Sequence, residues 1–264
     1  MSRVTLGLFI LLQSSFIAMG DEPIQSNTFS FRVEIPTDDS GKVAPKGRVR
    51  IPVIHNVMED ARIFLDDQGD QRTQVDVQTK VHPEVDHWWF QWSGLGADDA
   101  SKPLVGIVSF ADEGDGSLVM RPRVVSQRAD MTVSLRACDA SVSGKLLRYE
   151  PQPHKNTVGY WANADDTVTW MFEVREAGTY NLAILQGCGA EKGGSTVRAQ
   201  LAGSSSDSCD FQVEETGHFQ NFVWRTVGAL ELQAGVSSLT FSCVELANIA
   251  VGDFRQVELT LVRP

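Results

Sequence analysis

Two loops in the second half of the chain concentrate aromatic rings together with imidazole and amide groups. The side chains that they supply are His154, Asn156, Tyr160, Trp161, His218, Gln220 and Asn221. An aromatic plane can stack on the apolar face of a sugar ring, while amides and imidazoles hydrogen-bond to its hydroxyl groups, and sites of this mixed kind are typical of small ligands. If both loops lie at one edge of the fold, we expect Tyr160 or Trp161 to be the stacking platform.

The same residues also have a purely structural interpretation. Polar side chains that are buried in long loops are normally hydrogen-bonded in support of the backbone. On this interpretation the polar groups brace their loops, while Trp161 and Phe219 pack inside. The sequence leaves both interpretations open.

The elements that must position these loops are β-strands. Apolar residues alternate with polar ones at Val168, Trp170, Phe172 and Val174, which is the period of a half-buried strand. Similar short runs recur along the chain, separated by turn residues, and no long stretch has the period of a helix. Parallel α/β folds are excluded because their crossover helices are missing.

We therefore expect an all-β protein of two β-sandwich domains. The charged, glycine-rich stretch at residues 112–116 is the best candidate for the border between them. The expected domains are a β-rich one at residues 29–115 and a second one at residues 128–264.

Several motifs of the second domain resemble a known family. Residues 132–140 (TVSLRACDA), 166–174 (DTVTWMFEV) and 177–182 (AGTYNL) are similar to strands of carbohydrate-binding modules with a galactose-binding-like jelly roll. More narrowly, the chain resembles the accessory domain of some secreted bacterial sulfatases and fucosidases at residues 148–155 (RYEPQPHK), 185–189 (LQGCG), 216–222 (TGHFQNF) and 254–257 (FRQV). The resemblance covers about residues 130–264 and implies a jelly roll that binds carbohydrate.

The resemblance also raises the question of calcium. Related modules usually hold a structural calcium ion with a glutamate in the first strand, whereas this chain has Cys138 where that residue would be expected. Asp253 is a remaining candidate ligand, but calcium prefers several oxygen ligands and thiols substitute poorly. We expect no catalytic residues and no resident cofactor.

The first half, which the resemblance does not include, has two features of its own. On a strand His82, Glu84 and Asp86 would share a face, with His87 opposite, and three such ligands can hold zinc or manganese. Pro83 weakens that geometry. The run 88–92 (WWFQW) would place three aromatic residues on one face as core and Trp89 on the other, which is a candidate surface for a protein partner.

Four cysteines, Cys138, Cys188, Cys209 and Cys243, have no zinc-type spacing. Cys209 and Cys243 have the strand parity of inward-facing residues, so a disulfide between them is conceivable, and buried free thiols are the alternative. Cys188 has no base paired with it in the sequence and is expected to be inert. The neighbouring aspartates of the chain do not resemble glycosidase carboxylates, because adjacent side chains on a strand diverge.

The charge and the N-terminus constrain partners and location. The formal net charge is −11, which disfavours nucleic acid and other polyanions unless a local basic patch exists, and none is evident in the sequence. Arg3, the apolar residues 4–12 and the small residues near Gly20 are typical of a secretory signal at residues 1–20. No second apolar run is long enough to span a membrane.

The sequence thus favours a secreted, extracellular or periplasmic, non-catalytic protein that binds a glycan or polysaccharide. A structural or adhesion protein that makes protein–protein contacts is the main alternative, and a metal-dependent hydrolase in the first half is the other. The sequence does not identify the sugar, the role of residues 29–110 or the oligomeric state.

Overall fold

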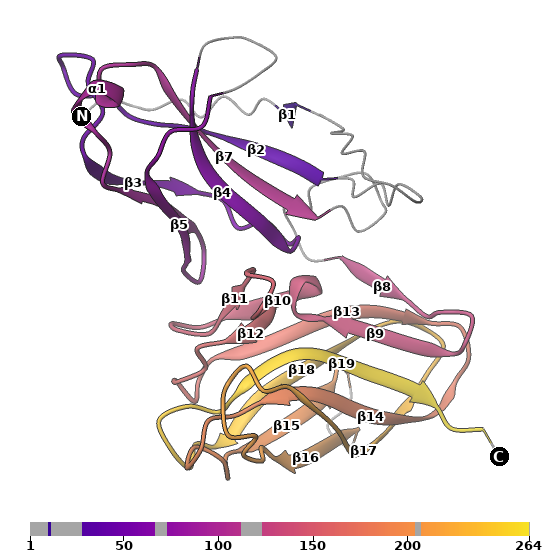
Figure 1. Ribbon diagram of the computed structural model, residues 1–264. Helices are drawn as coiled ribbons and strands as arrows, with labels where there is room; N and C mark the ends of the chain where they lie inside the picture. The colour runs from indigo at the N-terminus through magenta and orange to yellow at the C-terminus, as the bar shows by residue number, and fades with distance from the viewer. Residues whose placement is uncertain (1–9, 12–27, 67–72, 112–122, 204–206, 264) are drawn as a thin grey trace, which may run out of the picture. The chain divides into compact units, whose positions relative to one another are not determined.

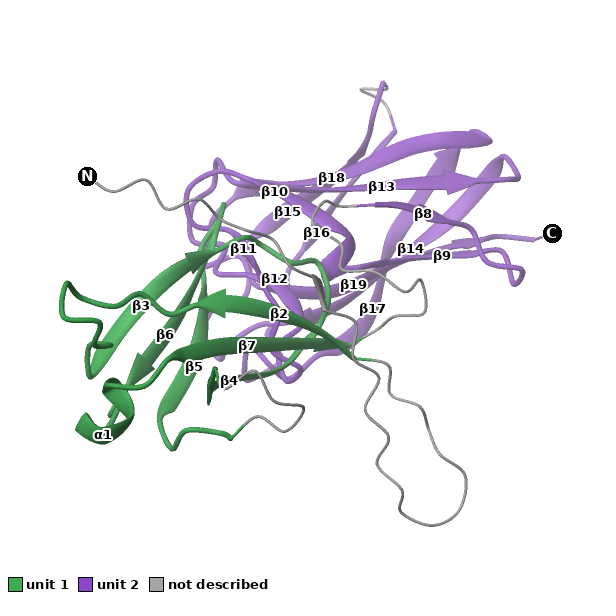
Figure 2. Cartoon of the chain, turned by 90° about the horizontal axis from the view of Figure 1, so that it is seen from above, with its two compact units in different colours: residues 1–118 green, residues 119–264 purple. Residues whose placement is uncertain are grey.

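The computed structural model of the chain describes residues 10–11, 28–66, 73–111, 123–203 and 207–263. The chain divides into two compact units, residues 1–118 and 119–264 (Figure 2). Each unit consists of β-sheets with almost no helix, which confirms the all-β class. The expected domain border at residues 112–116 lies outside the described residues, as does most of the expected signal segment. No helix in the described ranges has the length and hydrophobicity to cross a membrane.

The first unit pairs a four-stranded sheet, in the order β1-β2-β7-β4, with a three-stranded sheet, in the order β3-β6-β5 (Figure 1). All of these pairings are antiparallel. The elements are β1 (Ile10–Leu11), β2 (Thr28–Glu34), β3 (Lys46–Ile51), β4 (Met58–Leu65), β5 (Gln78–Pro83), β6 (Trp88–Ser93), α1 (Ala97–Ala100) and β7 (Leu104–Ala111).

The core of the first unit lies between its two sheets. Trp88, Phe90 and Trp92 are buried on one face of β6, as their alternation predicts. The ring of Trp88 stacks on that of Phe110 from β7, with 6.2 Å between the ring centroids. The opposite face of β6 presents Trp89, so the strand has one apolar and one half-exposed face.

The second unit is a β-sandwich of two six-stranded sheets. One sheet has the order β10-β13-β18-β15-β16, with β8 also paired to β13; the other has the order β11-β12-β19-β14-β17, with β9 also paired to β19. The first elements are β8 (Val124–Ser126), β9 (Thr132–Arg136), η1 (Ala137–Asp139), β10 (Ala140–Ser143), β11 (Arg148–Glu150) and β12 (Thr157–Gly159). The others are β13 (Thr167–Val174), β14 (Gly178–Gly187), β15 (Thr196–Leu201), β16 (Ser208–Gln212), β17 (Val223–Leu232), β18 (Gly235–Glu245) and β19 (Asp253–Leu261).

A chain of aromatic rings joins the two sheets of the sandwich. Trp170 on β13 and Phe211 on β16 each meet Phe241 on β18 edge to face, at 5.2 and 5.5 Å between centroids. Phe241 in turn contacts Phe254 on β19 of the other sheet, at 5.7 Å. Because these rings come from strands distant in sequence, their packing holds the two sheets in register with each other.

The strand order is incompatible with a Cys209–Cys243 disulfide. Cys209 lies on β16 and Cys243 on β18, with β15 between them. Two strand spacings separate their backbones by roughly 10 Å, beyond the reach of a disulfide. The conceivable bridge is therefore wrong, and all four cysteines are free thiols in the described structure. Shared parity put both residues on the inner face but said nothing about how many strands lay between them.

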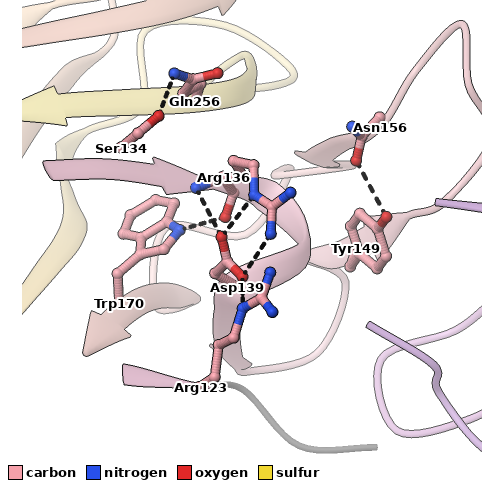
Figure 3. Close-up of polar contacts among 8 residues, drawn as sticks. All are labelled: Arg123, Ser134, Arg136, Asp139, Tyr149, Asn156, Trp170 and Gln256. Atoms are coloured by element: carbon pink, nitrogen blue, oxygen red, sulfur yellow. Dashed lines mark hydrogen bonds and ion pairs between the residues drawn. The ribbon is translucent and has the colours of Figure 1, made fainter. Parts of the chain in front are cut away.

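A buried ion-pair cluster closes the end of β9 (Figure 3). Asp139 is 2% exposed, and its two carboxylate oxygens accept from Nε of Arg123 at 2.8 Å and Nε of Arg136 at 2.9 Å. The carbonyl of Arg136 accepts from the indole of Trp170 at 2.8 Å. The carboxylate thus links the residue before β8 to the end of β9, and the Arg136 carbonyl links that end to β13.

Replacing this carboxylate should cost stability. We expect Asp139→Asn to lower the free energy of unfolding by about 3 kcal/mol, because two guanidinium groups would lose their buried counter-ion. The control is Asp210→Asn, which breaks the exposed Arg198–Asp210 pair and should cost less than about 1 kcal/mol. Urea denaturation of both variants measures the difference, and equal losses would contradict the assigned role.

Candidate functional site

Tyr160 is held in an unusual backbone conformation directly after β12. Its φ is +62°, and that of Asn156, directly before β12, is +40°, so a strand separates the two residues that the sequence placed in one loop. Only four non-glycine residues in the described chain have positive φ, and two of them flank β12. Backbone strain of this kind concentrates at functional sites because the surrounding fold must maintain it.

The strained backbone projects the Tyr160 ring into solvent. The residue is 54% exposed, although the strand residues just before it are buried. The guanidinium of Arg148 on β11 covers one side of the ring, with its central carbon 3.8 Å from the ring centroid. The cation fixes the orientation of the ring, while the residue as a whole stays exposed.

A pair of buried acids lies beneath Tyr160. Glu150 on β11 and Asp253 on β19 are 5% and 6% exposed. Gly159 leaves room for both, because a Cβ atom at this position would come within 2.7 Å of Asp253 Oδ1 and 3.1 Å of Glu150 Oε2. The ammonium of Lys155 lies 2.7 Å from Glu150 Oε1 and compensates one of the two charges.

The second acid of the pair, Asp253, has a strongly raised pKa. Burial, and next the nearby Glu150 carboxylate, raise the pKa of Asp253 to about 7, against the opposing effects of Lys155 and of the Tyr160 amide that donates to Asp253. Below about pH 7 the Asp253 carboxyl therefore holds its proton.

This shift in pKa predicts how stability depends on pH. Between about pH 4 and 7 folded Asp253 holds a proton that the unfolded chain has released, so its contribution to stability is largest at low pH and is lost as the pH rises to about 7. Asp253→Asn keeps an acceptor for the Tyr160 amide and removes the titration. We expect the variant to gain up to about 4 kcal/mol relative to the native chain across this interval.

Urea denaturation from pH 4 to 8 measures this gain. Asp165→Asn, at an exposed position of the same unit, is the control and should follow the native curve. Parallel curves for the native chain and Asp253→Asn would show that Asp253 is not shifted.

The residues around Asp253 do not fit a calcium ion. A calcium site needs six to eight oxygen ligands, whereas this place offers two carboxylates, one of them paired with an ammonium. Asp139, next to Cys138 in the sequence, already has both oxygens occupied by arginines. Within the described residues no three His, Cys, Asp or Glu side chains converge as metal ligands.

Arg255 connects the two loops that the sequence singled out. Its Nε donates to the carbonyl of Lys155 at 2.8 Å, and its terminal nitrogen donates to the carbonyl of His154 at 2.7 Å. The same guanidinium lies over the ring of Phe222, at 4.0 Å from the centroid. Burial lowers the pKa of Arg255. The His154 loop and the end of the His218 loop therefore meet at one edge of the sandwich, on either side of Arg255.

Trp161, one of the two predicted platforms, belongs to the core instead. It is fully buried, and its ring meets Phe254 edge to face at 5.9 Å. Its indole N–H has no hydrogen-bond partner among the described residues. The prediction of Trp161 as an exposed stacking surface is wrong because the reversed backbone at Tyr160 turns the next side chain inward. Tyr160 is left as the platform.

The buried position of Trp161 predicts a stability effect. Trp161→Ala should lower the free energy of unfolding by about 3–5 kcal/mol, since it leaves a large cavity. Trp161→Phe keeps most of the ring and removes a buried N–H that lacks a partner, so it should cost about 1 kcal/mol or less. Chemical denaturation distinguishes the two variants, and a small loss in Trp161→Ala would restore the platform interpretation.

The remaining predicted site residues either form hydrogen bonds within the protein or are exposed. In the second loop the Asn221 side chain donates to the carbonyl of Thr216, and Nδ1 of His218 accepts from the amide of Gln220 at 3.1 Å. In the first loop the Asn156 side chain accepts from the Tyr149 hydroxyl at 3.1 Å (Figure 3). The side chain of His154 is exposed, and that of Gln220 is half-buried.

The candidate metal ligands of the first half form two separate pairs. His82 lies 3.4 Å from Glu84, and His87 lies 2.6 Å from Asp86. The hypothesis of a zinc or manganese site is wrong because the turn after β5 separates the four side chains.

In the second unit burial raises the pKa of the Cys188 thiol, with Glu215 and Asp253 adding to the shift, which agrees with an inert cysteine.

Sequence reasoning missed the roles of the charged residues around Tyr160 and its loop. Arg148, Glu150 and Asp253 lie at Tyr160, and Arg255 holds the His154 loop. Arg148 and Glu150 flank Tyr149 in the three-residue strand β11, so the sequence alone indicates that they lie on the same face. Only the pairing of β12 with β19 brings Asp253 next to them.

Comparisons with known proteins find distant structural matches. No protein-family model and no curated protein matches the sequence. Solved structures with a similar fold include a family 35 carbohydrate-binding module from Clostridium thermocellum, which is 16% identical over 50% of this chain and 98% of its own, with a TM-score of 0.40. The C-terminal family 6 module of a marine laminarinase from Zobellia galactanivorans is 15% identical over 49% of this chain and 98% of its own, with a TM-score of 0.41.

A third match is a family 35 module from Cellvibrio japonicus, 11% identical over 49% of this chain and 92% of its own, with a TM-score of 0.40. These are modules of the class that the sequence motifs resemble. At such identities and TM-scores they carry no argument about the ligand, which must come from the site itself.

Proposed function

We propose that this protein is a secreted, non-catalytic carbohydrate-binding protein whose second unit binds sugar at Tyr160. The observation that carries the proposal is an exposed aromatic ring, held out by a strained backbone and stacked on one side by Arg148. The exposed part of the ring is suited to the apolar face of a pyranose. Rigid presentation lowers the entropy lost on binding, which matters for weak ligands such as single sugars.

Polar groups around the ring supply the complementary hydrogen bonds. Lys155 and the acid pair lie beneath it, and the side chain of His154 is exposed on the same loop. Gln220 and Asn221 belong to the loop that Arg255 brings to this edge. We assign the recognition of sugar hydroxyls to the groups that reach solvent, in the mixed apolar and polar manner of small-ligand sites. These are His154, Lys155, Gln220 and Asn221.

The distribution of exposed aromatics favours this proposal over an adhesion role. Adhesion through the 88–92 segment would need exposed apolar anchors there, yet the exposed large hydrophobic residues of the described chain all lie in the second unit, with Tyr160 among them. The two separated His–acid pairs of the first unit offer no support for a metal-dependent hydrolase.

Glycan arrays test the proposal directly. The purified chain, multimerised for avidity, should bind a selective set of glycans. Tyr160→Ala should lose at least tenfold in affinity with little change in stability, whereas Tyr160→Phe should keep most of it because stacking needs only the ring. Trp224→Ala is the matched control, because Trp224 is 46% exposed in the same unit.

Two outcomes would contradict the proposal. One is a folded chain that binds no glycan on the array. The other is loss of binding in Trp224→Ala but not in Tyr160→Ala, which would move the site to β17.

A further inference from the structure

The exposed face of the sheet β3-β6-β5 in the first unit gathers cationic side chains from two strands. Lys46, Arg48 and Arg50 alternate along β3, and Lys80 projects from β5. The register aligns Arg48 and Lys80 with Gln91 on the central strand β6. Since residues of equal parity lie on the same side of a sheet, all four cations share one face, at roughly 7 Å intervals along β3.

A hollow of about 830 Å³ lies over these strands. Its lining includes the side chains that share the exposed face, together with the intervening positions Gly47, Thr79 and Trp92. The lining side chains of the exposed face are Lys46, Arg48, Gln78, Lys80, Gln91 and Ser93. The hollow is therefore lined by cations and by neutral hydrogen-bonding groups in equal number.

The side chains in this hollow form few interactions with other groups of the protein. Arg50 pairs with Asp86 at 3.1 Å beyond the hollow, and His82 lies near Glu84. Within the described ranges no ion pair or hydrogen bond engages the side chains of Lys46, Lys80 or Gln91. The guanidinium of Arg48 lies over the Trp89 ring, at 4.1 Å from its centroid, which orients a cation without neutralising it.

This arrangement reverses an expectation from the sequence. The chain is acidic overall, and its basic residues look scattered because β3 and β5 are about thirty residues apart. The sheet brings the basic residues of β3 and β5 together on either side of β6, so a local basic patch exists after all. A positive patch on an acidic protein attracts an anionic ligand at short range, while the rest of the surface repels it.

We propose that this face binds an acidic polysaccharide, a chain of sugars bearing sulfate or carboxylate groups. The cations would pair with the acidic groups, and Gln78, Gln91 and Ser93 would hydrogen-bond to the hydroxyls between them. The proposal concerns the first unit and is independent of what binds at Tyr160.

Other polyanions fit this face less well. Protein partners are anchored by exposed aromatic or aliphatic side chains, and lipid surfaces by inserted apolar ones, but no large exposed hydrophobic residue of the described chain lies here. Single-stranded nucleic acid needs open aromatic rings for its bases, and Trp89 is already covered by Arg48 and by His87, at 5.0 Å.

Binding of the full-length chain to defined polymers tests the proposal. The probes are heparin, which carries sulfates, and polygalacturonate, which carries only carboxylates, with uncharged dextran as the reference. We expect affinity for at least one of the two acidic polymers, weakening as salt increases. Binding to heparin alone would identify sulfate as the required group, and binding to both would show that carboxylate suffices.

Paired substitutions locate the site. Lys46→Gln with Lys80→Gln should lower the affinity at least tenfold. Lys42→Gln with Lys102→Gln removes the same charge from the same unit, outside the hollow, and should lower it less than threefold. Gln91→Ala, which changes no charge, should also weaken binding at least threefold. Thermal melting verifies folding, and Lys80→Gln alone serves if the double variant does not fold.

Three results would overturn the proposal. The first is that neither acidic polymer binds at low salt. The second is that the control pair is as damaging as the pair in the hollow. The third is that poly-L-glutamate, oligothymidylate or phosphatidylserine vesicles bind as tightly as the polysaccharides, because the face would then be a general polyanion or membrane contact.

Discussion

The second unit depends on three consecutive residues at the start of β19. Phe254 enters the core, where it contacts Phe241 of the opposite sheet and the buried ring of Trp161. Its neighbours Asp253 and Arg255 must then point away from that core: one lies under Tyr160 and the other clamps the His154 loop. A single strand therefore couples the packing of the two sheets to the geometry of the candidate site.

The same coupling explains the strained backbone at Tyr160. Trp161 is drawn into the core against Phe254, while the Tyr160 amide is drawn toward the Asp253 carboxyl. Both demands are met only if the backbone reverses at Tyr160, and the cost of its positive φ is offset by burial of the neighbouring indole ring. The exposed ring is in this sense a consequence of how its neighbours are held.

In the first unit the alternation of side chains along the strands separates a core face of the sheet from an exposed face. The apolar face of β6 supplies the core through Trp88, Phe90 and Trp92, which leaves its other face free to be polar. The flanking strands β3 and β5 contribute alternating cations to that free face. The two units thus present different surfaces, an aromatic one at a loop and a cationic one on a sheet, and the two proposals assign them different sugars.

The sequence by itself determined the all-β class and the buried face of β6, because alternation with a period of two is a local property of the chain. It also identified the two loops that meet at Arg255. It could not choose between Tyr160 and Trp161, since a backbone reversal at one residue decides which ring is buried. Nor could it count the strands between Cys209 and Cys243, or foresee that Asp253 would join Glu150 and that Lys80 would join Arg48. Those relations depend on strand order and register, which contacts between distant residues decide and which local patterns do not contain.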